Sequence, residues 1–316
     1  NVTLKRSGKG APIQERSARV EAWAAIEKRI GAPSEAVLMK PAKKFLDKYL
    51  DAQLARIRAY ARNGKGADSQ IAKAFEADER ALRGELGFAE RIDSVLARVK
   101  AETGTTVDPE LARQAEALLL NKAEWEAKMR TLFAAPLKRV ASLALTDAAQ
   151  EIDSISIGVG HPAVAEALSK QTVTLAQDVT GTLAERVRTR ILESLSKATS
   201  TSDLHEAIKE VLPELEGSLK TAFANRDARA QVIARTEGAK ASNNARFEQF
   251  KEDGIAETQW LTEHDESVRD SHRAVDGTVA KVGEPFGNGL KYPGEDGAPP
   301  EEVINCRCRA APVFEE

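Results

Sequence analysis

A change in residue usage near Gly254 divides this sequence into two parts that must fold differently. Before it, Ala, Glu, Arg, Lys and Leu dominate, and apolar residues recur at intervals of three and four, which predicts helices. After it, residues 277–297 alone contain six glycines and two prolines, which predicts turns, long loops and short strands. We therefore expect a mainly α protein, in which a long helical N-terminal region precedes a small α+β C-terminal module.

Within the helical part, residues 181–197 carry the clearest amphipathic pattern, and a long helix is expected over 225–250. Pro136 is expected to kink or end its helix and Pro213 to end its helix, because proline removes a backbone donor. Residues 155–160 suit a short strand or a hinge. The predicted divisions are an extended arm over 1–35, a helical docking region over 36–150, further helices over 151–253 and the module over 254–316.

Charge and cysteine content exclude several classes of protein. Residues 1–250 hold 39 Lys and Arg against 34 Asp and Glu, whereas residues 251–316 hold 7 against 15. The overall net charge of −3 is too small to indicate a protein that wraps nucleic acid. No apolar run is long enough for a membrane span, so no membrane partner is expected. Cys306 and Cys308 are the only cysteines and cannot form the framework of a disulfide-rich secreted fold.

The most specific signals are five short motifs, which occur in order along the last 85 or so residues. They are A-R-T-E at 234–237 (followed by Asn243 or Asn244), W-x-T at 260–262, D-x-x-V-R-x-x-H-x-x-V-D-G at 265–277, Y-P-G at 292–294 and I-N-C-R-C at 304–308. Together these motifs resemble the Mu F-like phage head morphogenesis family, the minor head or minor capsid proteins of tailed bacteriophages. The resemblance covers about residues 180–313. The signature residues are Arg235, Glu237, Trp260, Thr262, Asp265, Arg269, His272, Asp276, Gly277, Asn305, Cys306 and Cys308.

The resemblance implies a structural, non-enzymatic role in head morphogenesis and in the packaging or release of DNA. It implies the portal protein and the major capsid protein as partners. It also implies a location in the virion, in the head interior or at the portal vertex, after assembly in the host cytoplasm. Such domains also occur fused behind a portal protein. A chain that begins at Asn1 rather than Met would fit the C-terminal part of such a fusion.

A zinc site is the most tempting chemistry in the module. His272, Cys306 and Cys308 are suitable zinc ligands, and His264 or Asp265 could complete a set of four. However, the Cys-x-Cys spacing is shorter than that of ordinary zinc fingers. We therefore expect no metal and no cofactor, with the two cysteines packing as small apolar residues on one face of the last strand, and zinc is kept as the weaker alternative.

Comparison with the resembled family points the same way. Many relatives carry a second cysteine pair and a His-Pro before the terminal Cys-Arg-Cys. This chain has Arg269 and Ser271 at the first place and residues 303–304, Val-Ile, at the second. These departures remove ligands that the relatives have.

Without a metal, the signature residues predict a structural network. Arg269, His272, Asp276 and Glu237 are expected to join the short helix of the module to the helix that carries Arg235 and to the terminal strand. Trp260 is expected to anchor the core of the module, and Gly277 to adopt a positive φ in a turn. Thr262 or Asp265 could cap the short helix. A catalytic pair of His272 and Asp265 lacks a neighbouring nucleophile, so no catalytic residue is predicted.

Two other functions remain as alternatives. One is a toxin or enzyme carried by the C-terminal module. An enzyme of the ADP-ribosyltransferase type would use a string such as Ser200, Thr201 and Ser202, although a helix connection explains that string better. An internal DNA-binding protein would use the basic clusters at 5–9, 40–48 and 186–190. Most basic residues are interleaved with acidic ones, which favours a solvated helix face.

Overall fold

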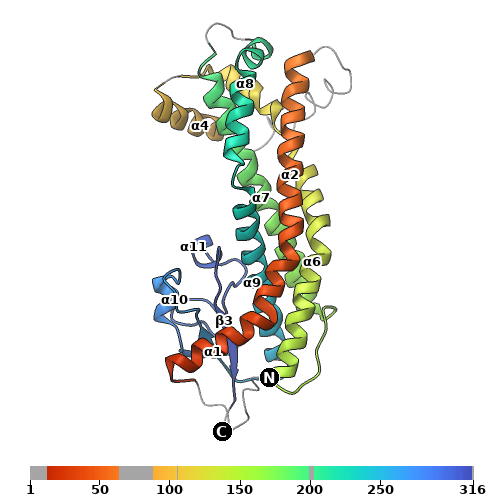
Figure 1. Ribbon diagram of the computed structural model, residues 1–316, viewed down its shortest axis with the longest axis vertical. Coiled ribbons are helices and arrows are strands. Elements are labelled where there is room, and N and C mark those ends of the chain that lie inside the picture. Colours follow the sequence, from red (N-terminus) through yellow and green to blue (C-terminus); the bar gives the residue numbers. More distant parts are fainter. Residues whose placement is uncertain (1–12, 64–87, 105, 199–202, 315–316) are drawn as a thin grey trace. The chain divides into compact units, whose positions relative to one another are not determined.

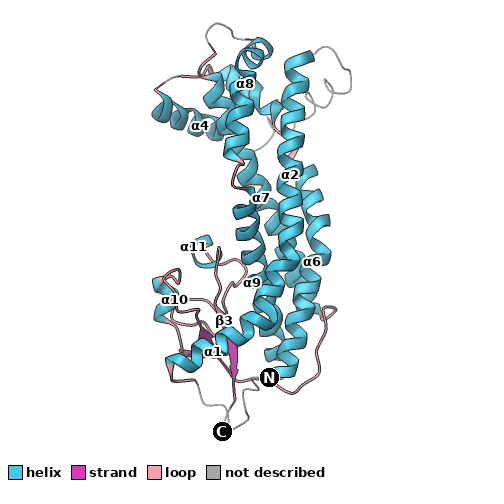
Figure 2. Ribbon diagram, in the orientation of Figure 1, coloured by secondary structure: helices cyan, strands magenta, loops and turns pink. Residues whose placement is uncertain are grey.

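The computed structural model describes residues 13–63, 88–104, 106–198 and 203–314. The protein is mainly helical, as the sequence predicts, and the strands found in these described residues all lie in the C-terminal module (Figure 2). Among the described residues, no helix combines the length and apolarity required to cross a bilayer. Ser200, Thr201, Ser202 and the cluster at 5–9 lie outside the described residues.

The elements follow one another in a simple order (Figure 1). The N-terminal half contains α1 Arg16–Ile26, the π-helical turn η1 Glu27–Gly31, α2 Ala32–Asn63, α4 Phe88–Thr103, α5 Pro109–Ala115, the 3-10 turn η2 Glu116–Leu118 and α6 Lys122–Glu151. The C-terminal half contains α7 Pro162–Leu195, α8 Leu204–Ala222, α9 Arg226–Glu252, β1 Glu257–Leu261, α10 Asp270–Ala274, β2 Val279–Lys281, α11 Pro300–Val303 and β3 Arg309–Val313.

The chain forms two compact units, each built from segments that are distant in sequence. Unit 1 comprises Asn1–Lys44, Arg130–Leu175 and Asp227–Glu316, and unit 2 comprises Phe45–Met129 and Ala176–Arg226. These units differ from the divisions expected from the sequence, because α2, α6 and α7 each contribute residues to both. Within a long helix, the residue composition does not change at the boundary between two units, so the sequence does not reveal that boundary.

Helix α9 forms the centre of unit 1. Most of its residues from Ala230 onward are buried, although the helix as a whole is polar in composition. Small side chains such as Ala234, Gly238 and Ala245 make this possible, because they let neighbouring segments approach closely. A Cβ atom at Gly238 would lie only 3.3 Å from Cβ of Ser34, near the start of α2.

A three-stranded antiparallel sheet packs beside α9, with the strand order β2-β1-β3. Gln259 of β1 pairs with Val279 on one side and Ala311 on the other. Trp260 is fully buried, as expected for a core anchor. It packs with the other members of a small apolar cluster: Val275, Phe286, Leu290, Cys306 and Cys308.

The N-terminal segment corrects one prediction. Residues 16–35, expected within an extended arm, are helical and belong to unit 1, where α1 contacts β1 (Figure 1). Ala22, Trp23, Ile26 and Ile30 are buried there. The π-helical turn at Glu27–Gly31 interrupts the 3.6-residue period, which explains why the amphipathic pattern was not apparent in the sequence.

Two smaller expectations were also wrong: that Pro213 ends its helix, and that residues 155–160 could form a short strand. Pro136 lies inside α6 and Pro213 inside α8 without ending either helix. Pro213 is exposed and Pro136 half-buried, so solvent can satisfy a carbonyl that loses its helical partner. Residues 155–160 form a loop without a strand. The helix expected over 225–250 is confirmed as α9.

Unit 2 has its own core. Phe45, Tyr49 and Trp125 pack edge to face, with ring centroids 5.6 Å apart for Phe45–Trp125 and 5.1 Å for Tyr49–Trp125. Arg188 of α7 donates two hydrogen bonds to the buried Glu116 of η2. Asp108 caps α5 by accepting from the backbone N–H of residues 110 and 111.

Candidate metal centre

The sequence motifs meet in space around Asn305. Its backbone N–H donates to Thr236 Oγ1 at 2.8 Å, and its Oδ1 accepts from Arg235 Nη1 at 3.0 Å. Its φ of 60° lies in the left-handed region, which asparagine adopts more readily than most residues. Two turns further along α9, Asn243 Nδ2 donates to the carbonyl of Cys308 at 3.1 Å. The A-R-T-E motif and Asn243 therefore fix the path of the I-N-C-R-C motif.

Further contacts fasten the loop after β1 to the rest of the module. Asp276 Oδ1 accepts from the backbone N–H of Thr262 at 2.9 Å and from its hydroxyl at 3.1 Å. Arg307 pairs with Asp265 at 2.6 Å, and Arg269 donates to the carbonyl of residue 304. Thr262 and Asp265 thus connect different segments of the module through a hydrogen bond and an ion pair. They do not cap α10, whose N-cap is Arg269 without a side-chain cap.

His272, Cys306 and Cys308 come together in a buried cluster. His272 Nδ1 lies 3.3 Å from Sγ of Cys308 and 3.6 Å from Sγ of Cys306. The three donor atoms all lie within 4.8 Å of one another, and none of the residues is more than 4% exposed. The chain is extended before β3, so alternate residues point the same way and bring both thiols to one side. Arg307 between them instead pairs with Glu263 and Asp265.

The other ring nitrogen of His272 faces a carboxylate. His272 Nε2 lies 2.9 Å from Glu302 Oε2, and the Ser271 hydroxyl donates to the same oxygen at 2.9 Å. The edge of the Trp260 indole packs against the imidazole with a centroid separation of 5.2 Å. Glu302 and Trp260 together fix the orientation of the ring, so Nδ1 points at the two thiols.

The two thiols differ in their electrostatics. A hydrogen bond from Cys308, together with the contact to His272, holds the pKa of Cys306 well below its ordinary value despite burial. The pKa of Cys308 is raised, because its thiol hydrogen-bonds to Cys306 and is buried.

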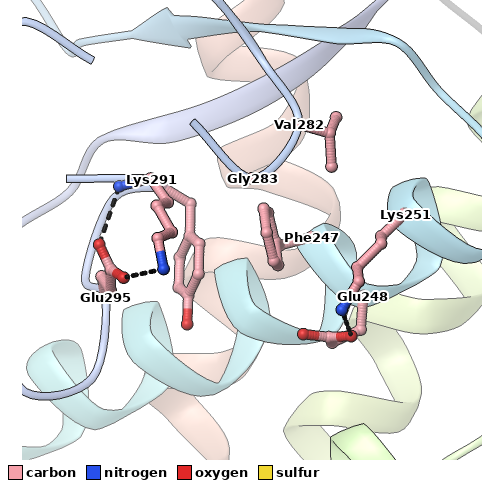
Figure 3. A pocket seen from close by; sticks show the side chains of 8 residues that line it. Phe247, Glu248, Lys251, Val282, Gly283, Lys291 and Glu295 are labelled. Carbon is pink, nitrogen blue, oxygen red and sulfur yellow. Dashed lines mark hydrogen bonds and ion pairs between the residues drawn. The ribbon is translucent and has the colours of Figure 1, made fainter. Parts of the chain in front are cut away.

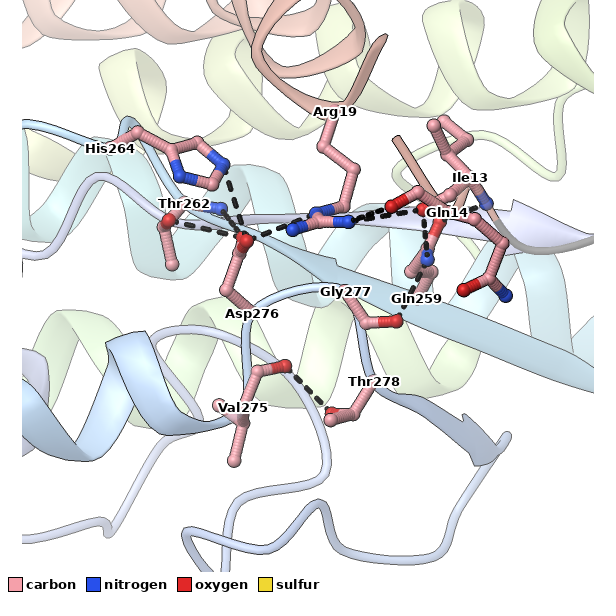
Figure 4. Close-up of polar contacts among 10 residues, drawn as sticks. All are labelled: Ile13, Gln14, Arg19, Gln259, Thr262, His264, Val275, Asp276, Gly277 and Thr278. Carbon is pink, nitrogen blue, oxygen red and sulfur yellow. Dashed lines mark hydrogen bonds and ion pairs between the residues drawn. The ribbon is translucent and has the colours of Figure 1, made fainter. Parts of the chain in front are cut away.

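The N-terminal segment contacts the same module through a polar patch around Asp276 (Figure 4). Arg19 of α1 donates to Asp276 Oδ2 at 3.0 Å, and His264 Nε2 lies 3.2 Å from the same oxygen. Burial lowers the pKa of His264, although the nearby Asp276 opposes this effect. Gln259 exchanges two hydrogen bonds with the backbone of Ile13, at 2.9 and 3.1 Å.

Three more contacts run along the N-terminal helices. Trp23 Nε1 donates to the carbonyl of Arg307 at 2.8 Å. Glu27 pairs with Arg309 at 2.7 Å, and Glu35 with Arg235 at 3.0 Å. The sequence analysis missed Arg19, Trp23, Glu27, Glu35 and Glu302. No local pattern could have revealed the four N-terminal residues, because their partners lie more than 190 residues away, but Glu302 is close to the I-N-C-R-C motif in sequence.

Only part of the network predicted from the signature residues is formed. Arg269 and His272 join the short helix to the segment before the terminal strand, whereas Asp276 and Glu237 contact other segments. The buried Glu237 accepts from Gln171 Nε2 of α7 at 2.9 Å and pairs with Lys240 one turn further along α9. The other three residues make the separate contacts given above. The motifs are thus held together by several separate hydrogen bonds and ion pairs, because the side chains of these four residues face different segments.

A surface pocket of about 330 Å³ lies elsewhere in unit 1 (Figure 3). Phe247 and Tyr292 line it with ring centroids 4.6 Å apart, and the Tyr292 hydroxyl accepts from Asn244 at 2.9 Å. Its two lysines pair with glutamates of their own segments, at 3.6 Å for Lys251 and 3.7 Å for Lys291. With its charges paired in this way, the pocket offers little to recognise an ionic ligand.

The buried cluster is suited to holding a metal ion and poorly suited to catalysis. Asp265 pairs with Arg307, so the His272–Asp265 pair considered from the sequence is not formed. A Cys306–His272 pair has the right chemistry for a nucleophile and a base. Both residues are at most 2% exposed, however, so a substrate has no access to them.

Comparison with known proteins agrees with the motifs. Residues 185–311 match the family described as Phage Mu protein F like protein. The match begins inside α7, later than residue 151, where the sequence analysis placed the start of this domain. An uncharacterized protein of Haemophilus influenzae is 25% identical over 149 residues, which are 47% of this chain and 29% of that protein. The chain therefore spans less than a third of that relative's length. No solved structure matches. Residues 185–311 of this chain are therefore similar to the Mu F-like family of phage proteins.

Proposed function

We propose that this chain is a non-enzymatic minor head protein of a bacteriophage, which associates with the portal vertex and acts in head morphogenesis and in the packaging or release of DNA. The observation that carries the proposal is the match of residues 185–311 to the Mu F-like family. Such a family indicates a protein of phage head morphogenesis and a component of the virion. The portal protein and the major capsid protein are the proposed partners.

The architecture supports a structural role. The signature residues bind one another and the N-terminal helices: Arg235 binds Glu35 and Asn305, and Asp276 binds Arg19 and Thr262. The cluster with the most reactive groups is closed to solvent. These side chains hold segments of the fold together. That role is typical of a structural protein rather than of an enzyme.

The DNA-binding alternative finds less support. Of the arginines at 186–190, Arg186 donates to the carbonyl of residue 222, Arg188 pairs with Glu116 and Arg190 with Glu193. These contacts lie within unit 2 and occupy the guanidinium groups that would bind phosphate. An arginine already paired with a carboxylate contributes little to the counterion release that drives binding to DNA.

The proposal is tested with procapsids assembled with and without the portal protein. Heads made from the phage genes, with an affinity tag on this chain, are purified and analysed by quantitative mass spectrometry, with the major capsid protein as the internal reference. We expect the chain in procapsids that contain the portal and its loss from procapsids that lack it. Equal amounts in both would contradict portal association.

The enzyme alternative is tested separately. The whole chain and its His272→Ala variant are expressed in the host at matched levels, and growth is followed. The proposal predicts that neither protein harms growth beyond the burden of an inert control. A growth defect that requires His272 would favour a toxin.

A further inference from the structure

The distances within the buried cluster match those around a tetrahedral metal ion. Zinc binds sulfur at about 2.3 Å and imidazole nitrogen at about 2.0–2.1 Å, so neighbouring sulfur and nitrogen ligands of a tetrahedral ion are roughly 3.6 Å apart. His272 Nδ1 lies 3.6 Å from Sγ of Cys306 and 3.3 Å from Sγ of Cys308. The two nitrogen–sulfur distances are therefore already close to those that coordination requires.

We propose that His272 Nδ1 and the thiolates of Cys306 and Cys308 bind one Zn²⁺ ion. Two thiolates and one imidazole form a set that favours zinc over magnesium or calcium, which prefer oxygen ligands. The inference does not depend on the proposed role in the phage head, because it rests on the cluster alone.

The residues around the cluster fit this assignment. Metal-binding imidazoles usually direct their second nitrogen at a carboxylate, which fixes the ring and strengthens the ligand. Glu302 Oε2 occupies that position, 2.9 Å from His272 Nε2, and is itself held by the Ser271 hydroxyl. Trp260 packs against the imidazole and lies in the same apolar cluster as the two cysteines.

The short Cys-x-Cys spacing, which argued against zinc in the sequence, is less of an obstacle in the fold. An extended segment places Cys306 and Cys308 on one side, and the distant α10 supplies His272. Among the described His, Cys, Asp and Glu residues, these three form the group close enough to share an ion. These three residues supply three of the four ligands of a tetrahedral ion.

A bound ion would act as a structural crosslink. It would join α10 to the segment that precedes β3, two parts of the module separated by long loops. Metal binding to a site that the unfolded chain lacks adds directly to folding stability. Such a crosslink would add most to the stability of the small core around Trp260, which contains Val275, Phe286 and Leu290.

The test is metal analysis of the full chain produced in zinc-supplemented cells. We expect about one zinc ion per chain by mass spectrometry of the metal content. X-ray absorption should give two sulfur ligands at about 2.3 Å and nitrogen at about 2.0–2.1 Å. Replacing zinc by Co²⁺ should produce the visible bands of a tetrahedral ion and a thiolate charge-transfer band. Removal by a chelator should lower the melting temperature, and Zn²⁺ but not Mg²⁺ should restore it.

Variants distinguish this site from adventitious binding. Cys306→Ser and Cys308→Ser should each reduce zinc content at least tenfold and weaken the charge-transfer band. His264→Asn is the matched control, since His264 lies in the same module outside the cluster and its φ of 61° suits asparagine. It should retain zinc. Circular dichroism of each variant shows whether it is folded. A folded wild-type chain with no zinc and no thermal response to added Zn²⁺ would overturn the inference, as would zinc retained by both folded serine variants.

Discussion

Arg246 is the residue whose replacement should damage unit 1 most. Its guanidinium is fully buried and pairs with Asp147 at 2.6 Å and with Glu151, both on α6. It also donates to the carbonyl of Ala310 in β3 at 3.2 Å. Asp147 accepts in addition from Arg29 of η1. One buried side chain thus connects α9 to the helical layer and to the sheet.

The structure sets the size of the expected loss. Removing one partner of a buried ion pair leaves an uncompensated charge and costs about 3–5 kcal/mol. After Arg246→Ala, Glu151, whose side chain is 6% exposed, loses its guanidinium partner, whereas Asp147 keeps Arg29. We therefore expect a decrease of about 3–5 kcal/mol in the free energy of unfolding of unit 1, out of a total of about 5–15 kcal/mol for a typical domain.

The assay is urea unfolding followed by circular dichroism, with native-state hydrogen exchange at the α9 amides to report on unit 1. Arg246→Met keeps most of the side-chain volume and should lose nearly as much stability as Arg246→Ala, because the cost is electrostatic. Arg273→Ala is the control: Arg273 forms an exposed pair with Asp270, whose removal should cost less than about 0.5 kcal/mol. A stability of Arg246→Met within about 1 kcal/mol of wild type would refute the reasoning.

Three further predictions concern the module. Trp260→Ala should destabilise it by about 3–5 kcal/mol in urea unfolding, because it empties the centre of the small core; a loss below about 1 kcal/mol would contradict that role. Gly277→Ala should cost about 1–2 kcal/mol for its φ of 75°, plus the displacement of Arg19, whose side chain lies 2.9 Å from the new Cβ. Gly254→Ala is its control, with a φ of 69° and open space, and an equal loss in both would show that the contact with Arg19 contributes nothing. The pKa of His264 is lowered from 6.5 in the folded state, so the unfolded chain takes up the proton first and stability should fall as the pH decreases below about 6.5. His264→Asn should show a shallower decrease over that range, and an unchanged pH dependence of stability would exclude the histidine as the cause.

The sequence was informative where structure depends on local pattern. Helix α9, the turn at Gly277 and the burial of Trp260 follow from periodicity, glycine chemistry and residue type. The order of the five motifs was enough to indicate the family, which the match at residues 185–311 supports. These features depend on residues that are close together in the chain.

The sequence was uninformative where a residue's partner lies far away in the chain. No sequence pattern near Trp23 or Glu27 indicates that they contact Arg307 and Arg309. A π-helical turn hid the helical period of the same segment. The Cys-x-Cys spacing at 306–308 looked unfavourable for a metal because it is shorter than that of ordinary zinc fingers, whereas the fold brings His272 of α10 next to both thiols.

The measurement that tests the central claim most directly is quantitative mass spectrometry of intact proteins from purified phage particles and procapsids. The account predicts that this chain is present in both the procapsid and the assembled head, at a small and constant ratio to the major capsid protein. Its absence from both kinds of particle, in cells where the protein is demonstrably made, would contradict a role as a minor head protein.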